Sequence, residues 1–269
     1  MVLPKPASAV SDYLVTQDWA GYSATEHATW KTLFERQQQI LQGRACVEFM
    51  NGIHALAVTA AGIPDFRRLN GILKEASGWE IVAVRGLVPD DAFFALLADR
   101  KFPATCFIRT PDQLDYIEEP DVFHDIFGHV PLLVHPVFGD YMQAYGKGGL
   151  KALSLGALEK LARLYWYTVE FGLIRTSEGL RIYGAGIVSS KGESIYALED
   201  RRPKRIAFDL LRIMRTRYRI DDFQEGYFVI DSFEELIEAT RPDFSPHYRQ
   251  LAKLPDIAPG DTIAGDRLL

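Results

Sequence analysis

The sequence predicts a mainly α-helical (α+β) fold, with one domain over residues 1–269 and short antiparallel β segments. Apolar residues recur at helical spacing through most of the chain, whereas the β-branched runs between them are short. No β-α-β pattern repeats along the sequence. These three features are typical of a single helical domain rather than of a large parallel sheet.

The N-terminal half contains four segments with helical periodicity and two strand-like segments. Residues 1–20 are rich in Pro, Ala and Ser and predict an arm laid over the domain. The first helix is closed by Gly43 in the position after its C-cap, and Pro89 suits the start of the fourth. The expected helices span 25–44, 45–61, 65–77 and 90–100, and the expected strands lie within 79–88 and 102–109.

The C-terminal half continues the helical pattern. Helices are expected over 118–129, 136–147, 152–173, 203–217 and 232–240, and short strands over 181–186 and 227–230. Residues 257–269 lack periodicity and predict a loose tail.

Composition excludes several classes of protein. Hydrophobic residues make up 48% and charged residues 25%, and the net charge of −6 repels a phosphate backbone. We interpret the basic runs 201–205 and 212–219 as solvated surface. No apolar run has the length of a membrane span, and Cys46 and Cys106 lack zinc-site spacing. We therefore expect a cytoplasmic protein without a nucleic-acid or membrane partner.

Two histidines suggest a metal site in the segment EEPDVFHDIFGHVP, residues 118–131. Pro120 between acids predicts a helix start, and Gly128 predicts its end. On a continuous α-helix, His124 and His129 would point about 140° apart. We expect a positive φ at Gly128 to turn His129 back toward His124. Paired histidines in an apolar segment are more often core residues, so the spacing alone leaves both interpretations open.

A third metal ligand would have to come from elsewhere. Glu170 falls at the edge of the apolar stripe of the 152–173 segment, where an uncompensated carboxylate is costly. The ordinary interpretation is a surface glutamate whose stem covers the core. The alternative makes Glu170 the carboxylate of a two-histidine, one-carboxylate triad, which leaves metal positions open for chemistry, unlike a closed structural zinc site.

Three sequence blocks resemble one family in both order and separation. PDVFHDIFGHVPLL, LYWYTVEFGL and YGAGIVSSKGE are similar to successive blocks of the pterin-dependent aromatic amino acid hydroxylases, and the similarity runs from about residue 80 to about residue 230. The resemblance implies the family's helical catalytic fold, a non-haem Fe(II) and a tetrahydropterin cofactor that work with O₂. The chain looks like the compact bacterial members without regulatory or tetramerisation segments, which implies a monomer.

The resemblance also assigns roles to individual residues. It makes His124, His129 and Glu170 the iron ligands and Arg109 the partner of the substrate carboxylate, for which a guanidinium fork is well suited. The other residues implied at the substrate are Ser189, Trp166, Pro120, Tyr116 and Glu193. Those implied at the pterin are Gly86, Val88, Phe93, Ala162 and Asp125, with Phe93 stacked on the pterin ring.

The substrate implied by the resemblance is L-phenylalanine. Trp166 resembles the residue at this position in the phenylalanine and tyrosine hydroxylases, whereas tryptophan hydroxylases have a smaller ring there. Ile220 is apolar at a position where tyrosine hydroxylases carry an acid. Tyrosine or tryptophan hydroxylation remains an alternative within the family. A metal-dependent hydrolase could use the same three ligands with a zinc-bound hydroxide, but it has no use for Phe93. A purely structural metal site is disfavoured because its coordination would be closed. A dinucleotide-binding site is disfavoured because YGAGIVSS lacks the third glycine of that fingerprint.

Overall fold

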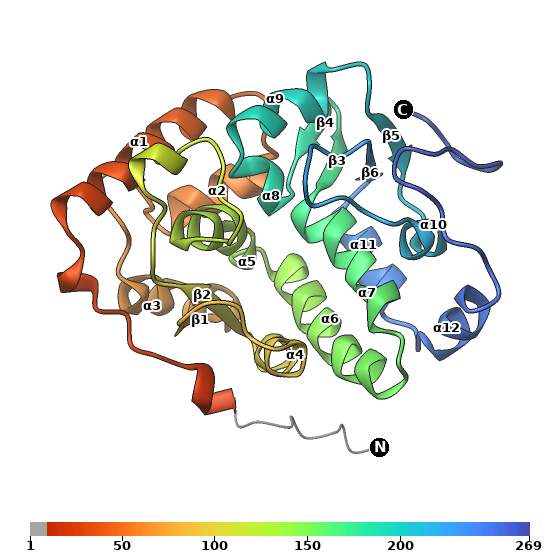
Figure 1. Cartoon of the computed structure of the whole chain (residues 1–269), viewed down its shortest axis with the longest axis horizontal. Helices are drawn as coiled ribbons and strands as arrows, with labels where there is room; N and C mark the ends of the chain where they lie inside the picture. The colour runs from red at the N-terminus through yellow and green to blue at the C-terminus, as the bar shows by residue number, and fades with distance from the viewer. Residues whose placement is uncertain (1–9) are drawn as a thin grey trace.

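The computed structural model describes residues 10–269, which contain twelve α-helices, two π-helices and six strands (Figure 1). The α-helices are α1 (Ala24–Ile40), α2 (Val47–Ala55), α3 (Phe66–Ser77), α4 (Asp90–Ala98), α5 (Val130–Leu133), α6 (Pro136–Ser154), α7 (Leu158–Tyr165), α8 (Ala185–Val188), α9 (Lys191–Glu199), α10 (Leu210–Arg215), α11 (Phe233–Thr240) and α12 (Ser245–Leu251). The strands are β1 (Glu80–Val84), β2 (Lys101–Thr105), β3 (Gly172–Thr176), β4 (Gly179–Ile182), β5 (Lys204–Ala207) and β6 (Gly226–Ile230). The mainly helical fold predicted from the sequence is confirmed.

The strands form two small sheets, on opposite sides of α5 and α6 in Figure 1. One sheet pairs β1 with β2, and the other has the order β4-β3-β6-β5. The expectation of antiparallel pairing is wrong for most of them, because only β3 and β4 pair antiparallel. Helix α4 joins β1 to β2 and α10 lies between β5 and β6, so two β-α-β units exist. Their strands of four or five residues are too short to appear as a repeat in the sequence.

In the N-terminal half, the predicted elements are present with shifted ends. Helix α1 begins after Ser23, which forms a capping box with Glu26. The C-cap of α1 is Leu41, so Gly43, with φ 69°, lies in the following turn rather than directly after the cap. The segment 45–61 yields only the shorter α2, whereas α3 and α4 agree closely with their predicted ranges.

The C-terminal half departs further from prediction. The expected helix 152–173 is divided: Gly156 has φ 64°, α7 begins at Leu158, and the chain passes through a π-helix into β3. The expected helix 203–217 begins as β5, because Lys204–Ala207 pairs with β6. In the segment 181–186 the strand ends at Ile182 and α8 follows. Helices α9 and α12 had not been predicted.

The core lies beneath the helical run that carries the two histidines. Buried apolar side chains form one cluster that extends along the chain from Trp30 to Leu251. Within it the rings of Phe123 and Phe127 stack with centroids 4.8 Å apart, and Trp30 of α1 packs edge-on against Phe123 at 5.3 Å. Burial of these rings fixes one face of the histidine segment against α1.

The described part of the N-terminal arm lies along the domain, while residues 1–9 lie outside the described residues. The backbone N–H of Val15 donates to Ala83 O at 2.9 Å, which adds this segment to the edge of β1. Trp19 Nε1 donates to Ile63 O at 2.7 Å. No helix in the described part of the chain is both long and apolar enough to cross a membrane.

The expectation of a loose C-terminal tail is wrong. Ile257 pairs with Thr216 and Leu268 pairs with Ile206, so the tail hydrogen-bonds to the body at two places. Arg212 Nε lies 2.8 Å from Asp266 Oδ1, and both side chains are about 5% exposed or less. Arg212 therefore does not lie on a solvated face, as the basic run had suggested, because the tail covers it.

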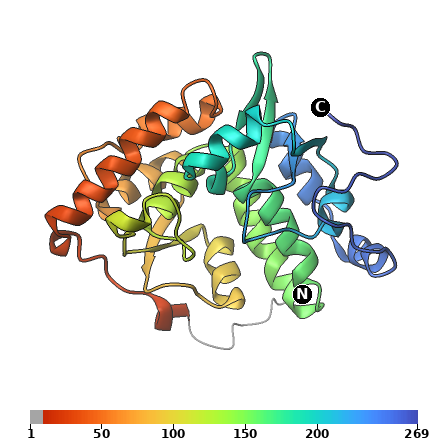
Figure 2. The ribbon, with the colours of Figure 1, turned by 45° about the horizontal axis from the view of Figure 1, so that its top comes forward.

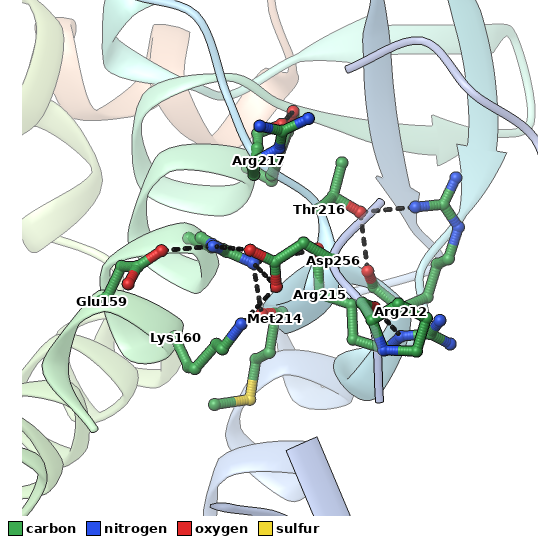
Figure 3. Close-up of polar contacts among 11 residues, drawn as sticks. Glu159, Lys160, Arg212, Met214, Arg215, Thr216, Arg217 and Asp256 are labelled. Carbon is green, nitrogen blue, oxygen red and sulfur yellow. Dashed lines mark hydrogen bonds and ion pairs between the residues drawn. The ribbon is translucent and has the colours of Figure 1, made fainter. Parts of the chain in front are cut away.

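A second group of charges holds the start of the tail against α7. Arg163, on α7, donates through both terminal nitrogens to the carboxylate of Asp256 at 2.9 Å. Figure 3 shows Asp256 beside Lys160, with which it is also paired, and Arg212 reaching Thr216. The chain after α10 leads into residues 220–224, which line a cavity. Figure 2 shows the chain after α12 continuing to the C-terminus.

Candidate metal centre and substrate cavity

A π-helix, His124–His129, brings the two histidines together. The helical run begins after Asp121, whose carboxylate accepts the backbone N–H of His124 at 3.0 Å. A π-helix closes each turn between residues five apart, so residues 124 and 129 fall on one face. The predicted helix end at Gly128 is wrong: its φ is not positive, and the helical run continues into α5. Gly128 instead allows close approach of α8, because an added Cβ would lie 3.0 Å from Ala185 O.

A second π-helix, Trp166–Glu170, presents the carboxylate. The backbone N–H of Phe171 donates to Trp166 O at 2.8 Å, the five-residue hydrogen bond of a π turn. This turn directs Glu170 toward the histidines, and its side chain is only 14% exposed. The interpretation of Glu170 as an ordinary surface residue therefore does not hold.

The three side chains converge on one point. His124 Nε2 lies 3.1 Å from His129 Nε2, and Glu170 has one oxygen 3.2 Å from His129 Nε2 and another 3.7 Å from His124 Nε2. Two metal–nitrogen bonds of about 2.1 Å at a right angle would separate the nitrogens by about 3.0 Å. The arrangement therefore fits a single metal ion held by two histidines and one carboxylate.

Burial and mutual charge set the protonation of this group. Burial lowers the pKa of His124 to about 4, although the charge of Glu170 opposes the shift. Burial alone would lower the pKa of His129, but the charge and hydrogen bond of Glu170 outweigh it and raise that pKa. Burial would likewise raise the pKa of Glu170, but His129 outweighs it and lowers that pKa. A neutral His124 and an ionised Glu170 are the forms that bind a metal.

Ser189, at the end of α8, orients His124. Its hydroxyl donates to Ala185 O at 2.7 Å, and its oxygen lies 3.0 Å from His124 Nδ1. Because the hydroxyl of Ser189 donates its proton to Ala185 O, the serine oxygen acts as the acceptor for the N–H at Nδ1 of His124. This leaves Nε2 of His124 unprotonated and facing the metal position. The expected role of Ser189 at the substrate had missed this contact.

A cavity of about 450 Å³ opens beside the three ligands. His124 and Glu170 line one part of it. All six residues expected at the substrate line it as well: Arg109, Tyr116, Pro120, Trp166, Ser189 and Glu193. Ile220, which is 73% exposed, lies at the rim.

Arg109 is held in place by a residue that sequence reasoning had missed. Its Nε and Nη2 donate to the two carboxylate oxygens of Asp121 at 2.8 and 2.9 Å. Burial would raise the pKa of Asp121, but Arg109 outweighs it and lowers that pKa. Among the described residues no acceptor contacts Nη1 of Arg109, so this edge of the guanidinium can meet a ligand. Asp121 thus connects Arg109 to the start of the π-helix that carries the two histidines. No sequence motif indicates this role.

Glu193 lines the cavity but uses its carboxylate internally. Its Oε1 accepts from Tyr227 Oη at 2.7 Å and from the backbone N–H of Gln224 at 3.1 Å. Burial raises the pKa of Glu193 to about 7, although the Tyr227 hydroxyl opposes the shift. Glu193 is therefore placed to hold the cavity wall.

The residues expected at the pterin form a separate group, and none of these five lines the cavity. The ring of Phe93 lies 5.9 Å from Tyr165, whose ring is 6.2 Å from that of His129. Asp125 is anchored to β2, where its Oδ2 accepts from the N–H and hydroxyl of Thr105 at 2.7 and 2.9 Å. Burial raises the pKa of Asp125 to about 7.

The remaining pterin candidates are partly accessible. Gly86 and Val88 are half-buried in the loop between β1 and α4, where an added Cβ on Gly86 would lie 3.0 Å from Glu119. Ala162 is half-buried on α7, one turn before Trp166. Gly86 and Val88 thus lie in the loop that leads into α4, the helix of Phe93, whereas Ala162 lies on α7.

Comparison with known protein families matches residues 15–251 to the Biopterin-dependent aromatic amino acid hydroxylases. The chain is a member of this family. A phenylalanine-4-hydroxylase from Ralstonia nicotianae is 64% identical over 258 residues, which cover 96% of this chain and 82% of the relative. Another from Chromobacterium violaceum is 61% identical over 264 residues, 96% of this chain and 89% of the relative.

The fold also matches solved members of the hydroxylase family. Phenylalanine hydroxylase from Chromobacterium violaceum bound to cobalt superposes with a TM-score of 0.95 at 59% identity and covers 99% of this chain and 95% of that one. The same enzyme has been solved with bound Fe(III). The family membership and helical catalytic fold implied by the three sequence blocks are confirmed.

Proposed function

We propose that this hydroxylase converts L-phenylalanine to L-tyrosine with O₂, Fe(II) and a tetrahydropterin. The observation that carries the proposal is one cavity that joins a converging His124–His129–Glu170 group to a buried Arg109. A metal and a fixed guanidinium in the same cavity suit an amino acid, whose carboxylate would bind the arginine while its ring faces the metal. Curated phenylalanine-4-hydroxylases at 60–64% identity support this choice.

His124, His129 and Glu170 would hold the iron. Fe(II) in such a site keeps neighbouring positions open for O₂, and the tetrahydropterin supplies the reducing electrons. The protein's own part is to present unprotonated ligand atoms. Ser189 does this for His124. The two π-helices direct all three side chains toward one point.

The substrate would be held at both ends. Arg109 keeps its orientation through Asp121 and offers Nη1 to the carboxylate. Trp166 and Pro120 would bound the aromatic ring, and Tyr116, which is 66% exposed, would close the outer side. Such walls would bind the ring by apolar contact and exclude water from the cavity.

The pterin would lie on the side of the metal marked by Phe93. This ring is half-buried, so one face can accept a flat heterocycle by stacking. Gly86 and Val88 would contribute backbone groups, while Ala162 leaves room beside them. Asp125 lies on the same π-helix as the histidines, and its anchoring by Thr105 suits a positioning role toward this side.

Phenylalanine is proposed over tyrosine and tryptophan because of two side chains. Trp166 and Ile220 both line the cavity. A ring as large as Trp166 should crowd an indole substrate, and the apolar Ile220 offers no polar partner to a phenol. An apolar pocket discriminates against an added hydroxyl by only about a hundredfold. Some tyrosine oxidation is therefore expected. A metal-dependent hydrolase would leave Phe93 and the arginine-lined cavity unexplained.

The direct test is product analysis. Purified protein loaded with Fe(II) is incubated with tetrahydropterin, O₂ and each aromatic amino acid in turn, and kcat/KM is compared. We expect tyrosine from phenylalanine with the highest kcat/KM. A higher kcat/KM for tyrosine or tryptophan would reject the substrate assignment, and absence of any hydroxylated product would reject the proposed function.

We also propose that the protein is a cytoplasmic monomer. Cys46 and Cys106 are both free thiols, which suits a reducing compartment. Size-exclusion chromatography with light scattering tests the oligomeric state, and a stable dimer would contradict it.

A further inference from the structure

Gln224 is a buried residue of the cavity wall whose side-chain oxygen, side-chain nitrogen and backbone N–H are all hydrogen-bonded. Its side chain and backbone together are 2% exposed. Its Oε1 accepts from Trp166 Nε1 at 3.0 Å, and its Nε2 donates to Arg219 O at 3.0 Å. Its backbone N–H donates to Glu193 Oε1 at 3.1 Å. The side-chain amide therefore has one orientation. A flip would place its NH₂ against the N–H of Trp166 and its oxygen against the carbonyl oxygen of Arg219.

Trp166 is the large ring at this wall of the cavity. One face of its indole stacks on Tyr218, with centroids 4.3 Å apart and planes 15° apart. Phe171 packs against it with a centroid distance of 4.9 Å. These apolar contacts permit the indole to slide or rotate in its plane. The hydrogen bond from the indole N–H to Gln224 removes that freedom, because this N–H is the only polar group of the ring.

We propose that Gln224 is a positioning residue that sets the selectivity for the substrate ring by holding the indole of Trp166. This inference rests on the proposed function. Gln224 acts from the loop 219–224, which Glu193 holds through the backbone of Gln224 itself. The selectivity of the cavity therefore depends on a hydrogen bond between the metal-ligand helix and a loop more than fifty residues later.

Loss of the Gln224 side chain should affect substrate binding more than turnover. Without Gln224, the indole N–H has no acceptor and the ring leaves its position. The wall contacts the substrate ring equally before and during reaction, so its displacement weakens binding uniformly and raises KM more than it lowers kcat. A displaced indole also vacates space, so the larger tryptophan substrate is rejected less strongly.

The test compares Gln224→Met, which keeps side-chain length but removes the amide, with Gln17→Met. Gln17 is a half-buried glutamine whose side chain likewise bonds to backbone, at Pro64 O and Phe66 N, in the N-terminal arm. For Gln224→Met we expect KM for phenylalanine to rise about tenfold, the size expected for an unpaired buried donor. We expect kcat within about twofold and a lower preference for phenylalanine over tryptophan. Gln17→Met should change neither KM nor preference.

A double-mutant cycle separates this role from general stability. Trp166→Phe removes the indole N–H, so adding Gln224→Met to it should raise KM no further if Gln224 acts through Trp166. Equal KM increases in both backgrounds would overturn the proposal, as would wild-type KM and preference in Gln224→Met. If Gln224→Met does not fold, Gln224→Asn, too short to reach both side-chain partners, should give the same direction of change. Failure of wild-type protein to hydroxylate phenylalanine would instead reject the proposed function.

Discussion

The orientation of His124 by Ser189 predicts a specific loss of metal affinity. Ser189→Ala removes the oxygen 3.0 Å from Nδ1 and leaves that N–H buried without an acceptor. The imidazole then loses the contact that fixes its tautomer and its plane. Loss of such a partner of a ligating histidine weakens metal binding by about 10- to 100-fold. Titration of metal-free protein with Co²⁺ against a competing chelator measures this affinity.

Ser194 provides a matched control for this experiment. It is fully buried, close in sequence, and its hydroxyl likewise bonds to backbone carbonyls, at Ile187 and Ser190, each at 2.7 Å. Ser194→Ala should lower stability by about 1 kcal/mol and leave Co²⁺ affinity unchanged. Wild-type affinity in Ser189→Ala, or an equal loss in Ser194→Ala, would refute the role assigned to Ser189.

Two other residues of the cavity give further predictions. Arg109→Lys should raise KM for phenylalanine by an amount equivalent to about 1–3 kcal/mol, because an ammonium cannot contact both Asp121 and a carboxylate in the same way; an unchanged KM in steady-state assays would show that the arginine does not bind substrate. Glu193 has a folded-state pKa raised by burial to about 7 from the ordinary 4.5, so the folded protein retains a proton that the unfolded chain releases. Stability should therefore fall as pH rises from about 4.5 to 7, by up to about 3 kcal/mol. Urea unfolding at several pH values should show this slope in wild-type protein and a flatter one in Glu193→Gln; identical slopes would contradict the assignment.

The sequence singled out the three side chains that converge in the structure, but not the backbone that brings them together. His124, His129 and Glu170 were all singled out, because two histidines and a carboxylate in an apolar setting are chemically unusual. The expected positive φ at Gly128 was wrong. A five-residue spacing fits a π-helix, but π-helices are rare and sequence periodicity does not signal them. In the structure the rings of Phe123 and Phe127 stack on each other and pack this segment into the core.

Residues that act through others were invisible in the sequence. Asp121 and Gln224 contact Arg109 and Trp166 respectively, and each pair is joined only by folding. The parallel sheet pairs were missed for the same reason. The strands β1 and β2 and helix α4 were predicted separately, but their pairing is a tertiary contact that short segments do not specify. The tail was also misjudged, since its anchoring depends on Arg212 and Asp266, which are 54 residues apart.

We propose that His124, His129 and Glu170 together hold one iron that supports hydroxylation. The most direct measurement is an anaerobic Fe(II) titration of metal-free wild-type protein and of His124→Ala, His129→Ala and Glu170→Ala, followed by assay of tyrosine formation. Circular dichroism on each variant checks that the fold is kept. We predict that wild-type activity rises to a plateau at one iron per chain, and that each variant stays folded but neither retains iron nor forms tyrosine. Full iron content and activity in any one variant, or wild-type activity without iron, would contradict the claim.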